Sequence, residues 1–120
     1  MIDHMLVERL YALAPNLYPL RAPKNYSTPC VVYSKLHCDP VRSVDSGASD
    51  RAWLIYQVDV YDPSHKAAHD LAKLIRDNLT GWTSNLVQSV AWTGTTSLID
   101  DTTEVPLFRA MSTYLIFASV

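Results

Sequence analysis

The stretch AWLIYQVDVYDPSHKAAHDLAKLIRDNLTG, residues 52–81, contains a strand followed directly by a helix, and this pair decides the fold. Over residues 52–61 apolar side chains recur at every second position, a period that predicts a strand with one face toward a core. Asp62-Pro63 then supplies a capping residue and a proline at the first helical position, and Gly81 ends the helix. The expected core-facing residues are Ala52, Leu54, Tyr56, Val58 and Val60 from the strand, and Ala67, Ala68, Leu71, Ala72, Leu74, Ile75 and Leu79 from the helix.

The second face of the predicted strand mixes apolar and polar side chains. Trp53, Ile55 and Tyr61 share this face with Gln57 and Asp59. An outward face with so many apolar side chains is expected where another molecule covers it. Aromatic residues scattered over a solvated surface are an equally weighted alternative.

The elements before this pair are a helix, an extended connection and a strand. Asp3 is expected to cap a helix that ends before Pro15, with Leu6, Leu10 and Leu13 as its apolar stripe. The prolines of residues 15–29 predict an extended segment, because proline neither continues a helix nor donates a hydrogen bond to a sheet. Residues 30–36 are β-branched and aromatic, and they predict a first strand.

Two polar segments separate the remaining strands. Residues 39–50 carry turn residues and little to bury, so they predict a long loop, and loops of this length in small domains usually have a function. Residues 86–92 predict a third strand, residues 94–104 a polar turn, and residues 107–120 a long fourth strand or a strand pair. The sequence therefore predicts one domain, residues 1–120, of the α+β class. We expect a mostly antiparallel four-stranded sheet with two helices packed on one face, in the order α-β-β-α-β-β.

Composition restricts the function classes. The chain has 120 residues and a net charge of -2, so binding of nucleic acid through many phosphates is disfavoured and no sequence-specific contact is indicated. No secretion signal or membrane span is apparent, which predicts a cytoplasmic chain without a membrane partner. In that reducing compartment Cys30 and Cys38 are expected to be free thiols.

The sequence contains residue types that occur in metal and active sites, but their arrangement disfavours both. His65 and His69 lie one helical turn apart near Asp62, as in two-histidine zinc sites, yet both are expected on the solvent side of the helix beside Lys73 and Arg76. The residues of the run His37-Cys38-Asp39 alternate in direction along a strand, and Asp100-Asp101 lies in a polar turn. The three glycines build no phosphate loop. We therefore expect no enzyme, cofactor or metal site, and keep a metal-dependent enzyme using His65 and His69 as the alternative from a different class.

Several segments together resemble the small tail-completion or tail-terminator proteins of long-tailed bacteriophages and prophages. The first is the proline-rich lead, residues 18–23 and 29–34, into a strand. The next is Tyr56-Gln57-Val58-Asp59-Val60-Tyr61-Asp62 running into Ala67-Ala68 and residues 71–76. The closing segment Phe108-Arg109-Ala110-Met111-Ser112-Thr113-Tyr114 also fits. The similarity is a pattern distributed over nearly the whole chain.

The resemblance implies a virion protein without catalytic residues, made in the cytoplasm of the bacterial host. Such a protein forms a ring, expected here to hold six copies, at the head-proximal end of the tail tube. There it stops polymerisation of the major tail protein and presents a surface to the head-tail connector. On this basis Arg42, Asp45, Asp50, Arg51 and Trp53 are the expected interface residues, with a solvated loop as the alternative for the charges. A connector or neck protein of the same particle is the nearest competing function.

Overall fold

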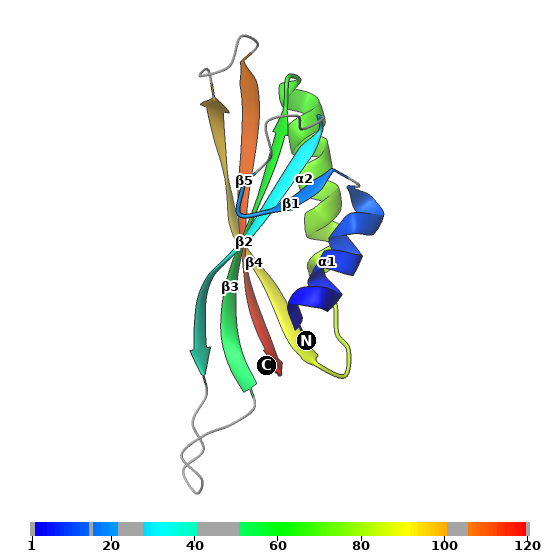
Figure 1. The fold of residues 1–120 in the computed structure, drawn as a ribbon, viewed down its shortest axis with the longest axis vertical. Coiled ribbons are helices and arrows are strands. Elements are labelled where there is room, and N and C mark those ends of the chain that lie inside the picture. Colours follow the sequence, from blue (N-terminus) through cyan, green and yellow to red (C-terminus); the bar gives the residue numbers. More distant parts are fainter. Residues whose placement is uncertain (1, 15, 22–27, 41–50, 101–105, 120) are drawn as a thin grey trace, which may run out of the picture.

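Two helices and five strands make up the described part of the protein, a computed structural model that describes residues 2–14, 16–21, 28–40, 51–100 and 106–119 (Figure 1). In chain order they are α1 (Ile2–Leu13), β1 (Leu17–Pro19), β2 (Cys30–Pro40), β3 (Arg51–Asp62), α2 (His65–Leu79), β4 (Val87–Asp100) and β5 (Leu107–Ser119). The α+β class and the two helices are confirmed. The predicted four-stranded sheet is wrong by one strand, because the sheet has the order β1-β2-β3-β5-β4.

The additional strand, β1, makes the sheet mixed instead of antiparallel. Leu17–Pro19 pairs in parallel with Val31, Val32 and Tyr33, whereas every other neighbouring pair among the described strands is antiparallel. The N–H of Leu20 donates to the carbonyl oxygen of Tyr33 at 2.9 Å, which extends the pairing past Pro19. Pro19 is tolerated because β1 is an edge strand and its outer side needs no donor. The proline content predicts an extended connection that cannot donate a full ladder of hydrogen bonds, and the short strand β1 within it is the part that the prediction missed.

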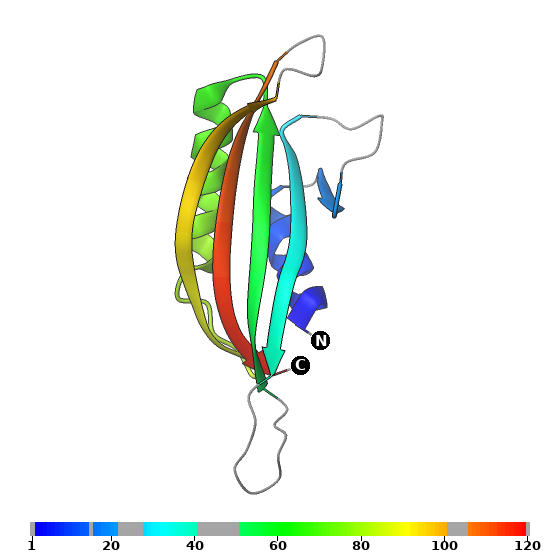
Figure 2. The ribbon, with the colours of Figure 1, turned by 90° about the vertical axis from the view of Figure 1, so that its left-hand side faces the viewer.

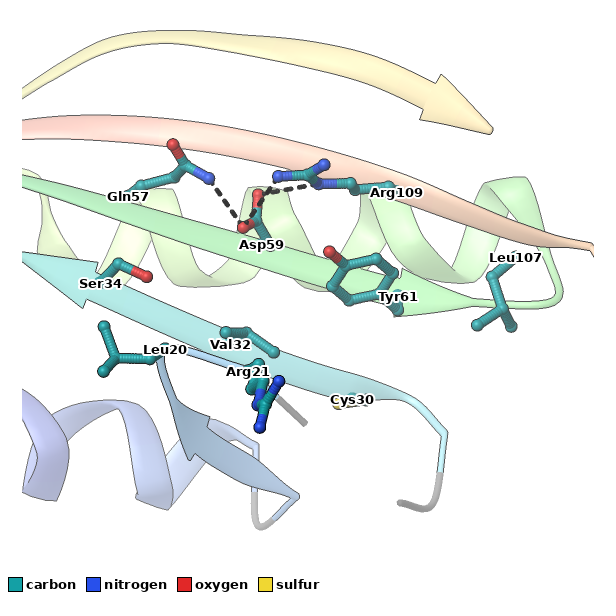
Figure 3. Close-up of a pocket in the computed structure, with 10 residues that line it drawn as sticks. All are labelled: Leu20, Arg21, Cys30, Val32, Ser34, Gln57, Asp59, Tyr61, Leu107 and Arg109. Atoms are coloured by element: carbon teal, nitrogen blue, oxygen red, sulfur yellow. Dashed lines mark hydrogen bonds and ion pairs between the residues drawn. The ribbon is translucent and has the colours of Figure 1, made fainter. Parts of the chain in front are cut away.

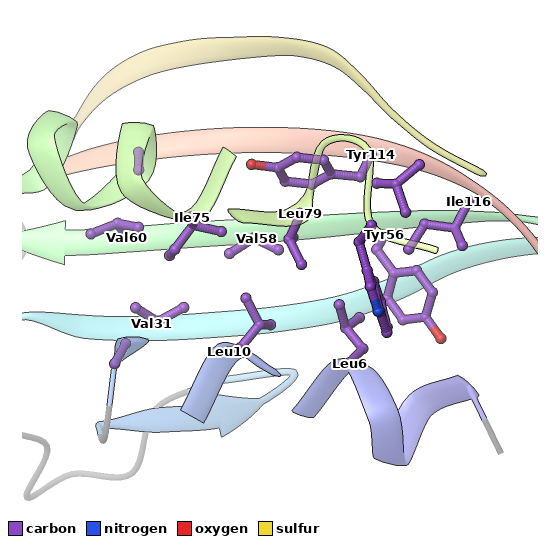
Figure 4. Packing of buried hydrophobic residues seen from close by; sticks show 14 of the residues in the cluster. Leu6, Leu10, Val31, Tyr56, Val58, Val60, Ile75, Leu79, Tyr114 and Ile116 are labelled. Carbon is purple, nitrogen blue, oxygen red and sulfur yellow. The ribbon is translucent and has the colours of Figure 1, made fainter. Parts of the chain in front are cut away.

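Both helices lie on one face of the sheet and bury its central strands (Figures 1 and 2). The alternation in β3 is confirmed, because its five expected core residues are all buried. Of the expected α2 stripe, Ala67 and Leu74 are exposed, so the buried stripe is narrower than predicted. The largest fully buried side chains, most of them in Figure 4, are Tyr56, Tyr114, Leu6, Leu10, Leu54, Ile75, Leu79, Ile116, Val31, Val58 and Val60.

Both helix starts differ from the prediction. Ser64 is the N-cap of α2, and its hydroxyl accepts a hydrogen bond from the N–H of Ala67 at 3.3 Å. Asp62 instead accepts from the N–H of Ser64 at 2.8 Å, so the carboxylate closes the turn before the helix and the serine caps it. Asp3 lies inside α1, which begins at Ile2. The prediction chose the wrong capping residue because Ser64 and Asp62 are both favoured at that position.

The strand boundaries also correct the predicted loops. β4 continues to Asp100, so residues 94–100 are strand and not part of a polar turn. Their threonines and β-branched neighbours suit a strand, and polarity alone does not exclude one at the edge of a sheet. β2 likewise extends to Pro40, which shortens the predicted loop of residues 39–50, and residues 41–50 are outside the described part. Neither described helix has the length and apolar character that a membrane crossing requires.

Replacement of Ile75 should test the packing of α2 on the sheet. Ile75 is 1% exposed, whereas the adjacent Leu74 is 50% exposed on the same helix. We expect Ile75→Ala to lower the free energy of unfolding by about 2–5 kcal/mol, and Leu74→Ala by less than about 1 kcal/mol. Urea unfolding followed by circular dichroism measures both. Equal losses would contradict the observed orientation of α2.

Candidate assembly surface

The helices leave one face of the sheet uncovered (Figure 2), and on this face β3 and β5 carry a row of apolar side chains. Trp53 pairs across the strands with Phe117, and Ile55 pairs with Leu115. The rings of Trp53 and Phe117 have centroids 4.6 Å apart with planes tilted by 34°, so they form an aromatic cross-strand pair. Trp53 is still 40% exposed. This row, defined here as the open-face row, is therefore apolar surface without a covering helix among the described elements.

An ion pair between a buried carboxylate and a half-buried guanidinium lies further along the same face. The carboxylate of Asp59 is 4% exposed and faces away from the helices, a direction in which the strand alternation alone would leave it in solvent. Nε and Nη2 of Arg109 each donate to one of its oxygens at 3.2 Å, and Nε2 of Gln57 donates to Oδ2 at 2.8 Å (Figure 3). The Arg109 guanidinium also lies 5.6 Å from the centroid of the Tyr61 ring. The two charges thus neutralise each other, and this part of the face carries no net charge from them.

A pocket of about 300 Å³ is built around this ion pair. The segment after β1 contributes Leu20 and Arg21, and the sheet contributes the remaining lining (Figure 3). The walls include the apolar side chains of Val32 and Leu107 and the thiol of Cys30. Burial raises the pKa of the Cys30 thiol to about 11, so the thiol is neutral at physiological pH. The pocket therefore combines apolar walls with a neutralised ion pair and contains no ionised nucleophile.

Two of the five interface residues expected from the sequence lie in the described part of the chain. Arg51 begins β3 and is exposed, and Trp53 belongs to the open-face row. Arg42, Asp45 and Asp50 lie outside the described residues. The expectation missed Phe117 and the Asp59–Arg109 pair, although alternation placed Asp59 on the outer face. The missing signal is register, because only the pairing of β3 with β5 identifies which side chains meet.

The two histidines of α2 have partners within the protein. The His65 and His69 rings lie 4.3 Å apart, and His65 also packs edge-on against Phe108 at 5.3 Å. Nε2 of His69 lies 3.0 Å from the hydroxyl oxygen of Ser97 on β4. His65 is exposed and His69 is half-buried beside Lys73 and Arg76, at the edge of the sheet where β4 lies. Among the residues whose side chains the structure describes, no three His, Cys, Asp or Glu residues are grouped as a metal site requires.

The two other candidate clusters are not brought together as sites. His37, Cys38 and Asp39 pair in register with Ile55, Leu54 and Trp53, so their side chains alternate between the sheet faces as expected. The side chain of Asp100 and all of Asp101 lie outside the described part of the chain.

Comparison with known proteins gives one family and one fold. The family model described as "Tail completion protein gp17" matches residues 7–118. Among solved structures, a chain of the "Virion of native gene transfer agent (GTA) particle" superposes with a TM-score of 0.65 at 15% sequence identity. The match covers 96% of this chain and 92% of the other, and it shows a shared fold. No curated protein matches the sequence.

Loss of the Arg109 side chain should destabilise the protein far more than loss of an exposed ion pair. Arg109→Ala leaves the buried Asp59 carboxylate without its cation, and we expect the free energy of unfolding to fall by about 3 kcal/mol. Lys66→Ala is the control, because it removes the exposed Lys66–Asp70 pair, with N···O at 3.0 Å, and should change stability by less than about 0.5 kcal/mol. Chemical denaturation measures both. Similar small losses would show that the pair does not hold the face together.

The two thiols should differ strongly in reactivity. At pH 8 a pKa of about 11 leaves only about one Cys30 thiol in a thousand ionised, and the side chain is also buried. We expect an alkylating reagent to modify the exposed Cys38 at least about 100-fold faster than Cys30. Peptide mass spectrometry after timed labelling measures the two rates, and a Cys38→Ser variant isolates Cys30. Comparable rates would contradict the burial of Cys30 beside the pocket.

Proposed function

The chain belongs to the tail completion protein gp17 family, and on this premise we propose that it forms a ring that ends the tail tube at its head-proximal end. Members of this family are structural proteins of the phage virion tail, and the chain is thus a tail completion protein of a phage-like particle. In the proposal the ring contains six copies, stops addition of the major tail tube protein and presents the surface that the head-tail connector binds. Its function is to form contacts and requires no catalytic residue.

The observation that carries this proposal is the open sheet face. In the described residues the helices cover one face only, while the other has the open-face row and an ion pair whose charges cancel. Exposed apolar surface of this kind is costly in water and is typical of protein interfaces. The solved structure with the same fold comes from a gene transfer agent virion.

The proposal assigns contact roles to the residues selected from the sequence. Trp53 supplies apolar area at the centre of an interface, and Arg51 supplies a charge at its border, where it affects orientation more than affinity. Arg42, Asp45 and Asp50 are proposed as further border charges on sequence grounds alone. The contacts join copies to each other and to the end of the tube.

Tube polymerisation tests the proposed function directly. The major tail tube protein of the same particle is polymerised alone or with the purified chain, and tube lengths are measured by electron microscopy. We expect each tube to have one capped end, and this end should no longer elongate when fresh subunits are added. Unimpaired growth at both ends would contradict termination. If gold-labelled chain nevertheless bound to the ends, the connector function would be favoured instead.

Trp53→Ala should weaken capping without unfolding the protein. Loss of a central aromatic side chain from an interface costs about 2 kcal/mol, so the concentration needed for half-maximal capping should rise about 10-fold to 30-fold. Tyr11→Ala is the matched control, because Tyr11 is 59% exposed on α1, on the opposite side of the sheet. It should cap as well as the unmodified chain. Equal effects of the two changes would contradict an interface on the open face.

A further inference from the structure

β4 is a long edge strand whose pairing with β5 is interrupted by register shifts between Val87 and Ser89 and between Trp92 and Gly94. In the described part of the chain it pairs with β5 on one side and with no strand on the other (Figure 2). Its residues 87–99 include no Lys, Arg, Asp, Glu or Pro. Natural edge strands are normally short, charged or interrupted by proline, because their unpaired N–H and carbonyl groups otherwise recruit another strand. A 14-residue edge of this composition is expected to receive a partner strand.

The other side of the sheet has a second free edge on β2. β1 pairs only with Val31, Val32 and Tyr33, so residues 34–40 have no strand partner outward of β2 in the described part of the chain. This edge has a bulge between Lys35 and His37 and ends in Pro40. These features limit non-specific pairing. β2 therefore favours a partner strand whose hydrogen-bonding groups match its own around the bulge over an arbitrary strand.

The two free edges lie at the same level of the sheet. Across the four long strands, Pro40 is in register with Val87 through Ala52 and Ala118. Ser34 is in register with Gly94 through Gln57 and Thr113. The part of β2 that extends beyond β1, residues 34–40, therefore spans the same height as residues 87–94 of β4.

The strand directions also allow the two edges to pair. β2 runs antiparallel to β3, β3 to β5, and β5 to β4, so β4 and β2 run in opposite directions. If a second copy stands beside the first with its helices on the same side, its β2 meets β4 as an antiparallel neighbour. Because the free segments share one height, a rotation with little shift along the strands brings them together. Head-to-tail contacts related by such a rotation close into a ring.

We propose that residues 87–94 of β4 pair with residues 34–40 of β2 in the next copy, which joins the sheets into one continuous band. This inference rests on the proposed ring and identifies the contact that holds its copies together. In the band, Cys38 of one copy lies opposite Val90 of its neighbour, because both are in register with Leu54 and Ile116. The side chains of these two residues are on the helix-facing side of the sheet, whereas that of Ala91 is on the open face.

Disulfide trapping tests the pairing with the native Cys38 as one partner. Val90→Cys and Ala91→Cys are each oxidised under mild conditions, with the chain alone and bound to tube ends. Cross-strand neighbours on one face are close enough for a disulfide, whereas residues on opposite faces are not. We expect Val90→Cys to give a ladder of linked copies, in which a disulfide joins Cys38 to the cysteine introduced at position 90. Ala91→Cys should give less than about a tenth of that yield, and adding Cys38→Ser should abolish the ladder.

A second pair protects the test against misfolding, because Val90 is buried. Asp39 and Ser89 are both exposed, both on the open face and both at the level of Trp53 and Phe117. Asp39→Cys combined with Ser89→Cys, in a Cys38→Ser background, should therefore cross-link as Val90→Cys does.

Native mass spectrometry and electron microscopy of the same samples separate this inference from the proposed function. Closed multimers whose copies are linked by either cysteine pair support the β4–β2 contact. Closed multimers in which neither pair forms a disulfide overturn the contact and leave the ring standing. If no multimer forms with the chain alone or on tube ends, the ring is overturned and the contact with it.

Discussion

The alternation of side chains along β3 is the constraint on which the rest of the structure depends. β3 pairs with β2 on one side and with β5 on the other over almost its whole length, so its two faces become the two faces of the sheet. One face presents Leu54, Tyr56 and Val58, which are buried beneath the helices. The opposite face of the same strand is not uniformly polar, because Trp53, Ile55 and Tyr61 occupy it together with Gln57 and Asp59. The uncovered apolar surface thus follows from the strand that builds the core.

The Asp59–Arg109 pair shows how this second face tolerates charge. A carboxylate at the centre of a sheet face is costly to desolvate unless a cation and further donors satisfy it. The fork of Arg109 and the amide of Gln57 provide them from within the sheet. The ion pair itself is therefore neutral, whereas Arg21 lines the pocket beside it and Asp39 lies level with Trp53 on the same face. A face that joins apolar side chains to polar and charged ones at their border is typical of protein interfaces.

A structural tail protein needs surfaces more than it needs a reactive centre, and the distribution of side chains agrees with membership of the tail completion family. The pocket beside the ion pair contains a thiol whose pKa is raised, and the histidines of α2 pack against each other, Phe108 and Ser97. What the described part of the fold exposes instead is a sheet face and two free strand edges at one height. In the proposed ring, these features contact the neighbouring chains.

The sequence by itself determined the α+β class, both helices and the inward face of β3, because periodicity and local turn chemistry carry that information; the family came from the resemblance of several segments to tail-completion proteins. Strand alternation also placed Trp53 on the outer face, and the family resemblance then selected it as an interface residue. Only the tertiary structure decided that Leu17–Pro19 joins the sheet in parallel, that residues 94–100 continue β4, and that Ser64 caps α2. It likewise decided that Arg109 meets Asp59 and Phe117 meets Trp53. The physical reason is that pairing depends on register between distant segments, and no local pattern specifies which residues of two strands lie opposite each other.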